Sequence, residues 1–376
     1  MRSGWRGVAR RLPWGFLGLV VIVAEVETYV RRHAIDFTET AAYSWTLSAS
    51  SARREAKDAD ILCLGDSLVK HGVLPEILQR RLGGMVRNIS TCAATAPAHF
   101  TFLKHAIEAG ARPKAVVVDF MPGLLAGGPE YGMRYWPELL STGELIELAR
   151  SARSVDLATR TLLSRWFPTI RSRWEIRDHL VAGVNGEVDR LGPTNQTHRR
   201  NWGLNLGAQF TPDSRTYEGN VTREDEDRYL ATRFWSHRVN RDYLERFLRL
   251  AETHSIQVYW LIPPSTPDLQ ALRDRSGADA KFTQFIRDSL KRHPDVVVLD
   301  ARLQGFPSTC FIDPIHLTGR GALLLSESVA SAIATQPRGW IDLSTTPSTS
   351  QPPPMEDLES SRQWVLSRLN ERHHLK

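Results

Sequence analysis

The stretch ADILCLGDSLVKHG, residues 59–72, decides the fold of this chain. Within it, residues 61–64 form a short apolar run that follows a charged segment and stops at Gly65. A run this short that ends at a glycine is typical of a strand buried on both faces of a parallel sheet. Gly65 then lets the backbone turn sharply, and a helix is expected from residue 68 to residue 78. Ser67 is therefore predicted at the carboxyl end of a buried strand, where open α/β sheets carry their chemistry.

Ser67 has two interpretations from this stretch alone, because serine is also a favoured N-cap residue. A nucleophile needs a base elsewhere, and the stretch CFIDPIHLTGRG, residues 310–321, supplies one. Asp313 and His316 stand three residues apart with Pro314 between them, and a proline there is well placed to open a turn. One turn puts the carboxylate and the imidazole on the same side, with the second ring nitrogen free for a serine. The sequence therefore predicts a catalytic triad of Ser67, His316 and Asp313.

Apolar runs and helical patterns alternate along the rest of the chain. Further strands are expected at residues 85–89, 114–120, 256–262 and 296–299. Strands and helices that alternate at short intervals are typical of right-handed βαβ units and a parallel sheet. Residues 136–237 interrupt this alternation: the first part is helical in pattern and the second has no clear periodicity. We expect this segment to be a largely helical insertion that caps a site.

GDSL at residues 65–68 and DPIH at residues 313–316 resemble the first and last sequence blocks of the SGNH, or GDSL-type, hydrolases. The resemblance spans roughly residues 60–334 apart from the insertion. It implies a three-layer α/β/α sandwich with a five-stranded parallel, flavodoxin-like sheet. It also implies that Ser67 is the nucleophile and that Asp313 and His316 supply the acid and the base.

The middle blocks of that family fit this chain less well. The family's glycine in the loop after the second strand is missing from residues 88–97, so the backbone N–H of Ala93 or Ala94 has to join that of Ser67 in an oxyanion hole. The family's asparagine after the third strand falls where this chain has Met121-Pro122-Gly123, which offers no side-chain amide. Loss of one oxyanion donor typically costs on the order of 10²–10³ in rate. Four polar residues near these loops are assigned no role: Lys70, His71, His99 and Asp119.

The amino-terminal segment predicts an association with a membrane. Four arginines among residues 2–11 precede an apolar run at residues 14–24, and residues 12–30 are just long enough to span a bilayer. Glu25 and Glu27 make a poor membrane core, so a cleaved signal peptide competes with an uncleaved anchor, and a buried helix is a third option. Cleavage after Ala24 puts the bulky Ile22 where a small residue is wanted, which favours the anchor. The basic flank then stays in the cytoplasm and the remainder lies outside.

Composition limits the classes of partner and divides the chain. The net charge is +6, but the arginines are scattered, so no nucleic-acid surface is predicted. The three cysteines show no metal-type spacing, so no metal and no cofactor are expected; Cys92 and Cys310 are free thiols or, as the less favoured alternative, a disulfide. The expected organisation is an anchor or signal at 1–31, a linking helix at 32–58, an α/β domain at 59–335, a Pro/Ser/Thr-rich linker at 336–354 and an amphipathic helix at 355–376.

The sequence thus predicts a serine esterase that acts outside the cytoplasm on an acyl ester or acylated glycan through an acyl-enzyme. Two alternatives remain open. The order of anchor, helix and nucleophile strand is similar to that of extracytoplasmic O-acyltransferases that modify cell-surface polysaccharides. The missing asparagine leaves room for a non-catalytic domain that binds glycan in the old cleft.

Overall fold

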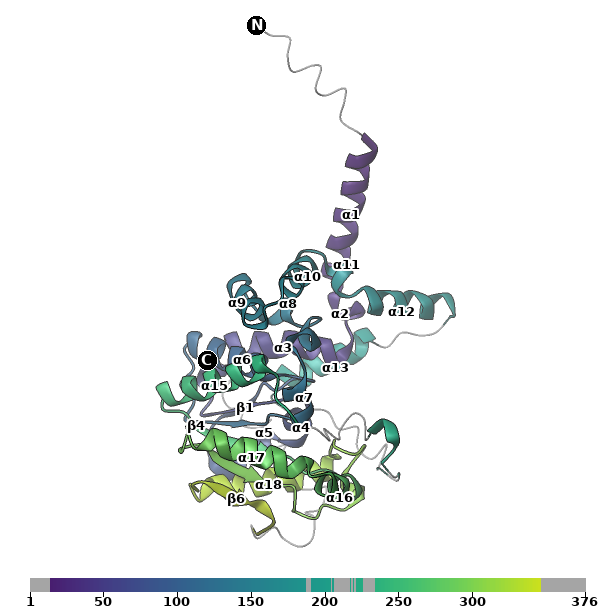
Figure 1. Cartoon of the computed structure of the whole chain (residues 1–376). Coiled ribbons are helices and arrows are strands. Elements are labelled where there is room, and N and C mark those ends of the chain that lie inside the picture. The colour runs from purple at the N-terminus through teal and green to yellow at the C-terminus, as the bar shows by residue number, and fades with distance from the viewer. Residues whose placement is uncertain are drawn as a thin grey trace, which may run out of the picture.

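The structure is a computed structural model that describes residues 14–186, 191–203, 205, 217, 219, 221–225 and 234–345 (Figure 1). Six strands form one parallel sheet in the order β2-β1-β3-β4-β5-β6. They are β1 Ile61–Leu64, β2 Val86–Asn88, β3 Ala115–Val118, β4 Gln257–Ile262, β5 Val297–Asp300 and β6 Trp340–Asp342. The prediction of an α/β fold around a parallel sheet is confirmed.

The prediction of five strands is wrong, because β6 adds a sixth at the edge. Trp340 pairs with Val298 of β5 in parallel register, and Leu343 directly after the strand is fully buried. The strand has three residues inside a segment rich in proline, serine and threonine, so no apolar run marks it. The sheet therefore continues past residue 335, into the segment that composition assigns to a linker.

Helices cover both faces of the sheet, which gives three layers. On one face, Leu62 and Leu64 of β1 pack with α3 Thr40–Arg54, α6 Ala96–Glu108 and α15 Arg238–Thr253. On the other face, Ile61 and Cys63 pack with α5 Pro75–Leu82 and α18 Gly319–Ala334. Neighbouring residues of a strand point to opposite faces, so the continuous run Ile61–Leu64 fills both cores at once.

Two helices follow β1 where the sequence predicts one over residues 68–78. They are α4 Ser67–Gly72 and α5. Pro75 is the cause, because proline in the first turn of a helix favours a new start and cannot continue an old helix. As a result α4 is a six-residue helix whose amino end carries Ser67.

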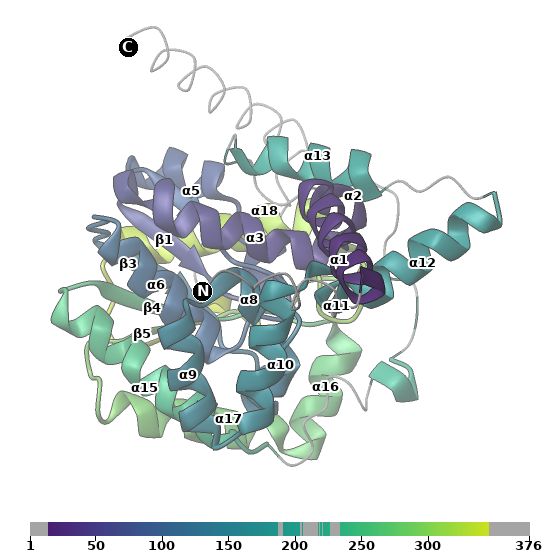
Figure 2. The ribbon, with the colours of Figure 1, turned by 90° about the horizontal axis from the view of Figure 1, so that it is seen from above.

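The insertion is helical over most of its described length. Its helices are α8 Trp136–Leu139, α9 Thr142–Ala152, α10 Val155–Trp166, α11 Pro168–Arg171, α12 Arg173–Val184 and α13 Leu191–Gly203. α8 and α13 contact α3, and α9 contacts α15. Seen from above, α8 to α13 lie around the amino-terminal helices α1 Trp14–Arg32 and α2 Ala34–Phe37 (Figure 2). Further α-helices are α7 Pro122–Ala126, α16 Pro267–Ser276 and α17 Ala278–Leu290, and a short 3-10 helix spans Pro129–Gly132.

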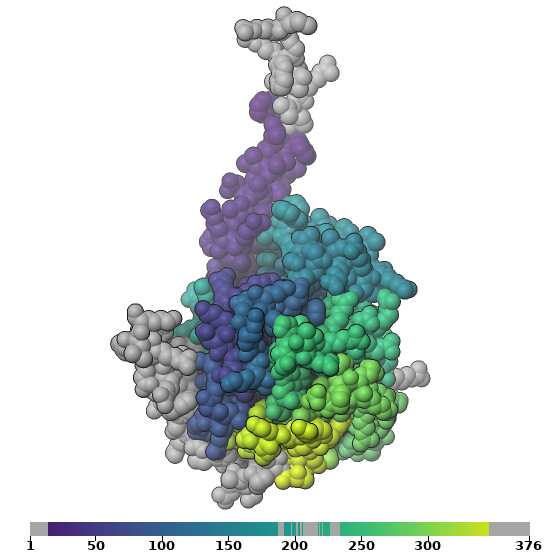
Figure 3. Space-filling view, turned by 90° about the vertical axis from the view of Figure 1, so that its left-hand side faces the viewer, coloured from purple at the N-terminus to yellow at the C-terminus, as the bar shows by residue number. Residues whose placement is uncertain are grey.

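Helix α1 stands out from the body of the molecule (Figures 1 and 3). Most of its side chains are exposed, and only Glu27 and Val30 near its lower end are buried. Among the described residues, no helix has both the length and the apolar character needed to cross a membrane. The four arginines before the apolar run, residues 346–354 of the predicted linker and the predicted helix at 355–376 lie outside the described residues.

The strand order reverses at β1, which places the site. β1 pairs with β2 on one side and with β3 on the other. The chain therefore adds β2 on one side of β1 and all later strands on the opposite side. Ligands of open α/β sheets bind in the crevice outside the carboxyl ends of the strands at such a reversal. The turn after β1, the loop after β2 and the residues after β3 all reach this point.

Candidate active site

The turn between β1 and α4 sets the position of Ser67. Asp66 is the N-cap of α4, and its side chain accepts a hydrogen bond from the Leu68 N–H at 2.7 Å. Ser67 is the first residue of the helix, so the N-cap interpretation belongs to Asp66 and not to Ser67. Gly65 is required by close packing, since a Cβ at this position would collide with the carboxylate of Asp119.

Ser67, His316 and Asp313 lie in one hydrogen-bonded row. His316 Nε2 is 2.8 Å from Ser67 Oγ, and His316 Nδ1 is 2.6 Å from Asp313 Oδ2. Both distances are within hydrogen-bonding range, and the order of groups is that of a nucleophile, a base and an orienting acid. The structure therefore brings together all three residues of the predicted triad.

The DPIH turn holds the acid and the base rigidly. Asp313 Oδ1 accepts hydrogen bonds from the backbone N–H groups of Ile315 and His316 at 2.9 and 2.8 Å. An antiparallel bridge between Phe311 and Leu317 closes the segment around them. Burial raises the pKa of Asp313, but the bond to His316 and the backbone donors outweigh it and hold that pKa below its ordinary value. Asp313 is therefore a carboxylate that faces the imidazole.

The loop after β2 lies against the nucleophile turn. The Thr91 N–H donates to the Gly65 carbonyl at 3.0 Å, and Ala93 adopts a left-handed conformation with φ of 53°. Within the described residues, the backbone N–H groups of Ser67, Ala93 and Ala94 donate no hydrogen bond. These are the three groups that the sequence predicts for an oxyanion hole, and each remains available to donate a hydrogen bond to an oxyanion.

Helix α3 supports this loop from behind, which the sequence analysis missed. Ser44 Oγ lies 2.7 Å from Thr91 Oγ1, and the Trp45 indole N–H donates to the Cys92 carbonyl at 2.8 Å. Trp45 is fully buried. The sequence shows Ser44, Trp45 and Ser48 on one face of a helix of small residues, which indicates a polar contact. It does not indicate which loop that face contacts. The predicted linking helix is therefore part of the site's framework.

A buried lysine and a thiol meet beside the loop. The Lys70 side chain is 4% exposed, and its ammonium group lies 3.6 Å from Cys92 Sγ. Burial lowers the pKa of Lys70, and Cys92 partly offsets that effect. Cys92 is half-buried, whereas Cys63 and Cys310 are buried, and all three are free thiols. The favoured expectation of free thiols is confirmed.

Three more polar groups lie beside the triad or beside the turn that carries Ser67. His71 lies edge-on to His316 with ring centroids 6.0 Å apart, and burial with the nearby charge of Lys70 keeps its pKa well below the ordinary histidine value. Burial lowers the pKa of His99 to about 3. Asp119 Oδ1 accepts the Asp66 N–H at 2.9 Å, and burial and then the charge of Asp66 raise the pKa of Asp119 well above its ordinary value. Burial thus favours the neutral form of both histidines and the protonated form of Asp119.

Residues after β3 approach the same edge without a side-chain amide. Met121 is the N-cap of α7 and Gly123 is an exposed residue of its first turn. Met121 packs against the small apolar cluster of Leu68, Leu269 and Ile315. The wall of the site beside Ser67 is therefore apolar on this side.

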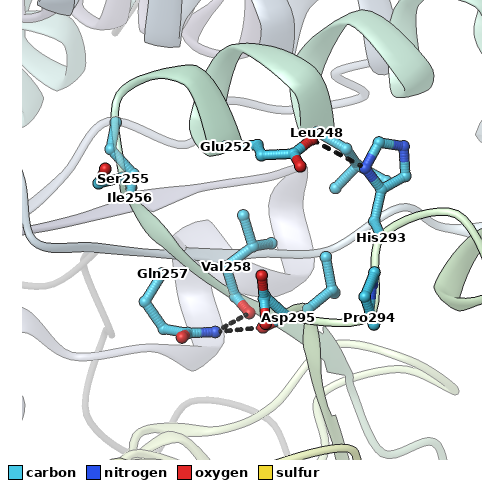
Figure 4. Close-up of a pocket in the computed structure, with 10 residues that line it drawn as sticks. Leu248, Glu252, Ser255, Ile256, Gln257, Val258, His293, Pro294 and Asp295 are labelled. Carbon is cyan, nitrogen blue, oxygen red and sulfur yellow. Dashed lines mark hydrogen bonds and ion pairs between the residues drawn. The ribbon is translucent and has the colours of Figure 1, made fainter.

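A separate cavity of about 310 Å³ lies at the opposite edge of the sheet (Figure 4). It is lined by the amino end of β4, by α15 and by the residues before β5, and His293 points toward Glu252 there. None of the predicted site residues lines it. Among the described residues, no group of three or more histidine, cysteine, aspartate or glutamate side chains is placed to hold a metal ion.

The sequence matches no family model and no curated protein.

Proposed function

We propose that this chain is a serine ester hydrolase of SGNH type that works through an acyl-enzyme. The observation that carries the proposal is the row from Ser67 Oγ to His316 Nε2 at 2.8 Å and from His316 Nδ1 to Asp313 at 2.6 Å. The row lies at the carboxyl edge of β1, at the reversal of a sheet whose first five strands have the flavodoxin-like order. The resemblance of the GDSL and DPIH stretches to that family supports the same assignment.

The reaction follows from the positions of these groups. His316 Nε2 takes the proton of Ser67 Oγ as the oxygen attacks the acyl carbonyl, and Asp313 stabilises the imidazolium that forms. The backbone N–H groups of Ser67, Ala93 and Ala94 stabilise the negative oxygen of the tetrahedral intermediate. His316 then returns the proton to the leaving alcohol, which departs with the ester C–O electrons. Water repeats the sequence and releases the acid.

A fluorophosphonate probe tests the nucleophile. Wild-type protein should be labelled and Ser67→Ala should not, with unfolding temperatures that are nearly equal because Asp66, not Ser67, caps α4. Ser154→Ala is the matched control, because Ser154 caps α10 through its side chain and its loss should cost stability without loss of labelling. Equal labelling of wild type and Ser67→Ala would refute the nucleophile, and labelling of neither would favour a glycan-binding domain.

An O-acyltransferase is the second candidate, favoured by the exposed helix α1 that leads through α3 into the site. The same acyl-enzyme serves both reactions, and the acceptor decides between water and a sugar hydroxyl. Turnover of an aryl acetate with and without added oligosaccharide separates them. A hydrolase yields acetate in both cases, whereas a transferase yields acetylated sugar in preference to acetate.

The proposed site of action is outside the cytoplasm, with the amino-terminal segment at the membrane. The support is the basic flank before the apolar run of α1. A reporter enzyme that is active only outside the cytoplasm, fused after Lys376, should be active in cells. Activity of a cytoplasm-only reporter at the same junction would overturn this orientation.

A further inference from the structure

Exposed apolar side chains gather in one part of the insertion. Of the fourteen large apolar side chains that are exposed outside α1 in the described part of the chain, nine come from residues 155–184. They are Val155, Leu163, Trp166, Phe167, Ile170, Trp174, Leu180, Val181 and Val184. Exposed apolar clusters of this kind mark interaction surfaces in soluble domains.

This cluster is fixed to the base of α1. The carboxylate of Glu27 accepts the Thr169 N–H at 2.9 Å and also binds the Thr169 hydroxyl. The Arg31 guanidinium donates to the Trp166 carbonyl at 3.3 Å. These contacts tie α1 to α11 and to the end of α10. The exposed side chains of α11 therefore lie beside the base of α1, directly after its exposed apolar part.

The upper part of α1 needs an apolar environment. Residues 14–26 are exposed on every side of the helix and are apolar apart from Glu25 and two glycines. A helix that is apolar all round is stable when it is buried in protein or lipid. At 1.5 Å per residue this part extends about 20 Å, which fills most of the roughly 30 Å hydrocarbon layer of a bilayer.

Helix α12 has the position of an interfacial helix. It extends sideways from the base of α1 and runs crosswise to it in both ribbon views (Figures 1 and 2). Trp174, Arg177, Val181 and Val184 share one face by helical spacing, and all four are exposed. The Arg177 guanidinium lies over the Trp174 ring at 4.7 Å. Tryptophan with arginine on a helix that lies across a membrane anchor is typical of the bilayer interface.

The charge of this region is complementary to anionic lipid. Residues 153–184 contain six arginines and three acidic residues. Arg160, Arg173 and Arg177 are exposed beside the apolar side chains. Basic residues near a membrane surface are attracted by anionic headgroups, by about 1 kcal/mol each.

We propose that residues 160–184 form a membrane face that rests on an anionic lipid bilayer, with α1 inserted beside it. Trp166, Phe167, Ile170 and Trp174 enter the interface, and the exposed arginines bind lipid phosphates. The proposal rests on the proposed membrane association of α1, but not on the esterase activity. The membrane face holds the carboxyl edge of the sheet, which carries Ser67, at a fixed height above the lipid.

Fluorescent probes on the full chain test the face. Three variants are made in a Cys92→Ser background, and each carries an NBD fluorophore on its introduced cysteine. They are Trp174→Cys in the membrane face, Val20→Cys in α1 and the control Trp235→Cys. Trp174 and Trp235 are both 56% exposed, and Trp235 lies outside the membrane face. Vesicles of phosphatidylcholine and phosphatidylglycerol should raise the emission of the probe at position 174 at least twofold. Lipids that carry the spin label near the headgroup should quench the probe at position 174 most strongly. Lipids that carry the label near the end of the acyl chain should quench the probe at position 20 most strongly.

The outcomes separate this proposal from the one it rests on. A probe at position 174 that stays as solvent-exposed as the one at position 235, while position 20 is quenched, would overturn the membrane face alone. A probe at position 20 that never meets lipid would overturn the association of α1 as well. Emission at position 174 that is already high before vesicles are added would assign the face to a second copy of the chain.

Charge is tested in a second measurement. Arg177→Gln should weaken partition of the full chain to phosphatidylglycerol vesicles about fivefold, the equivalent of roughly 1 kcal/mol. Arg249→Gln is the control, because Arg249 is exposed on α15 away from the membrane face. Equal partition of the two variants would refute the role of the arginines.

Discussion

Ser67 Oγ and His316 Nε2 lie 2.8 Å apart although 249 residues separate them in the chain. β1 and α4 carry the serine, and the turn before α18 carries the histidine. The two elements meet because α4 and α5 pack against α18 on the same face of the sheet. A change in either turn should therefore affect the reaction more than the fold.

Asp313→Asn should keep the fold and reduce kcat/KM on an aryl ester by about 10⁴, because the amide favours the wrong imidazole tautomer. Steady-state kinetics with circular dichroism measures both. Asp156→Asn, an exposed carboxylate on α10, is the control and should leave kcat/KM unchanged. A loss below tenfold at position 313 would contradict an orienting role.

The same substitution should change stability in acid. The pKa of Asp313 is held below its ordinary value in the folded protein, so this carboxylate stabilises the fold above about pH 4. That contribution is lost as pH falls through the folded pKa. Urea unfolding between pH 2 and 7 should therefore show a shallower acid loss for Asp313→Asn than for wild type. Parallel curves would contradict the shift.

Asp119 should behave in the opposite way. Its raised pKa means that the folded protein keeps a proton that the unfolded chain loses above about pH 4, so stability falls as pH rises. Asp119→Asn keeps an oxygen for the Asp66 N–H and never ionises. It should equal wild type near pH 4 and exceed it in free energy of unfolding near pH 8.

Asp119→Ala is the matched comparison. It leaves the buried Asp66 N–H without its acceptor, and it should lower the free energy of unfolding by about 1–3 kcal/mol. Chemical denaturation at two pH values measures all three proteins. An alanine variant as stable as the asparagine variant would show that the hydrogen bond contributes nothing.

Cys92 should be the first cysteine to react with iodoacetamide. It is half-buried beside Lys70, whereas Cys63 and Cys310 are buried, and burial raises the pKa of Cys63 to about 12. Mass spectrometry of the native protein should find one modified site. Turnover should fall with modification, because Cys92 precedes the proposed oxyanion donors, and Cys92→Ser should resist the reagent. Modification of all three thiols at equal rates would contradict the burial pattern.

Gly123→Asn should raise turnover of an aryl acetate by up to the roughly 10²–10³ that one oxyanion donor contributes. Gly123 is exposed in the first turn of α7, where its φ is not positive, so an asparagine adds no backbone strain there. Gly123→Ala is the control, because it adds a side chain without an amide. Equal rates for the asparagine and alanine variants would mean that another group already fills the hole.

Local patterns in the sequence were enough for the central strands and for the two halves of the triad. Residues 61–64, 115–118 and 297–299 are buried on both faces, so each appears as an unbroken apolar run. Asp313 and His316 are three residues apart, and their contact is made within one turn. Interactions of this range depend on neighbours in the chain, which is why they are readable there.

Only the tertiary structure decided which distant residues complete the site. β6 has three residues and becomes a strand because β5 offers it an edge. Asp66 caps α4 in place of Ser67, Asp119 supports Asp66 from the end of β3, and Trp45 of α3 holds the Cys92 carbonyl. The Asp66 cap is local, but the contacts of Asp119 and Trp45 join groups from separate elements in a buried space, where a polar atom must find a partner. The packing of the layers selects that partner, and no local pattern of residues records it.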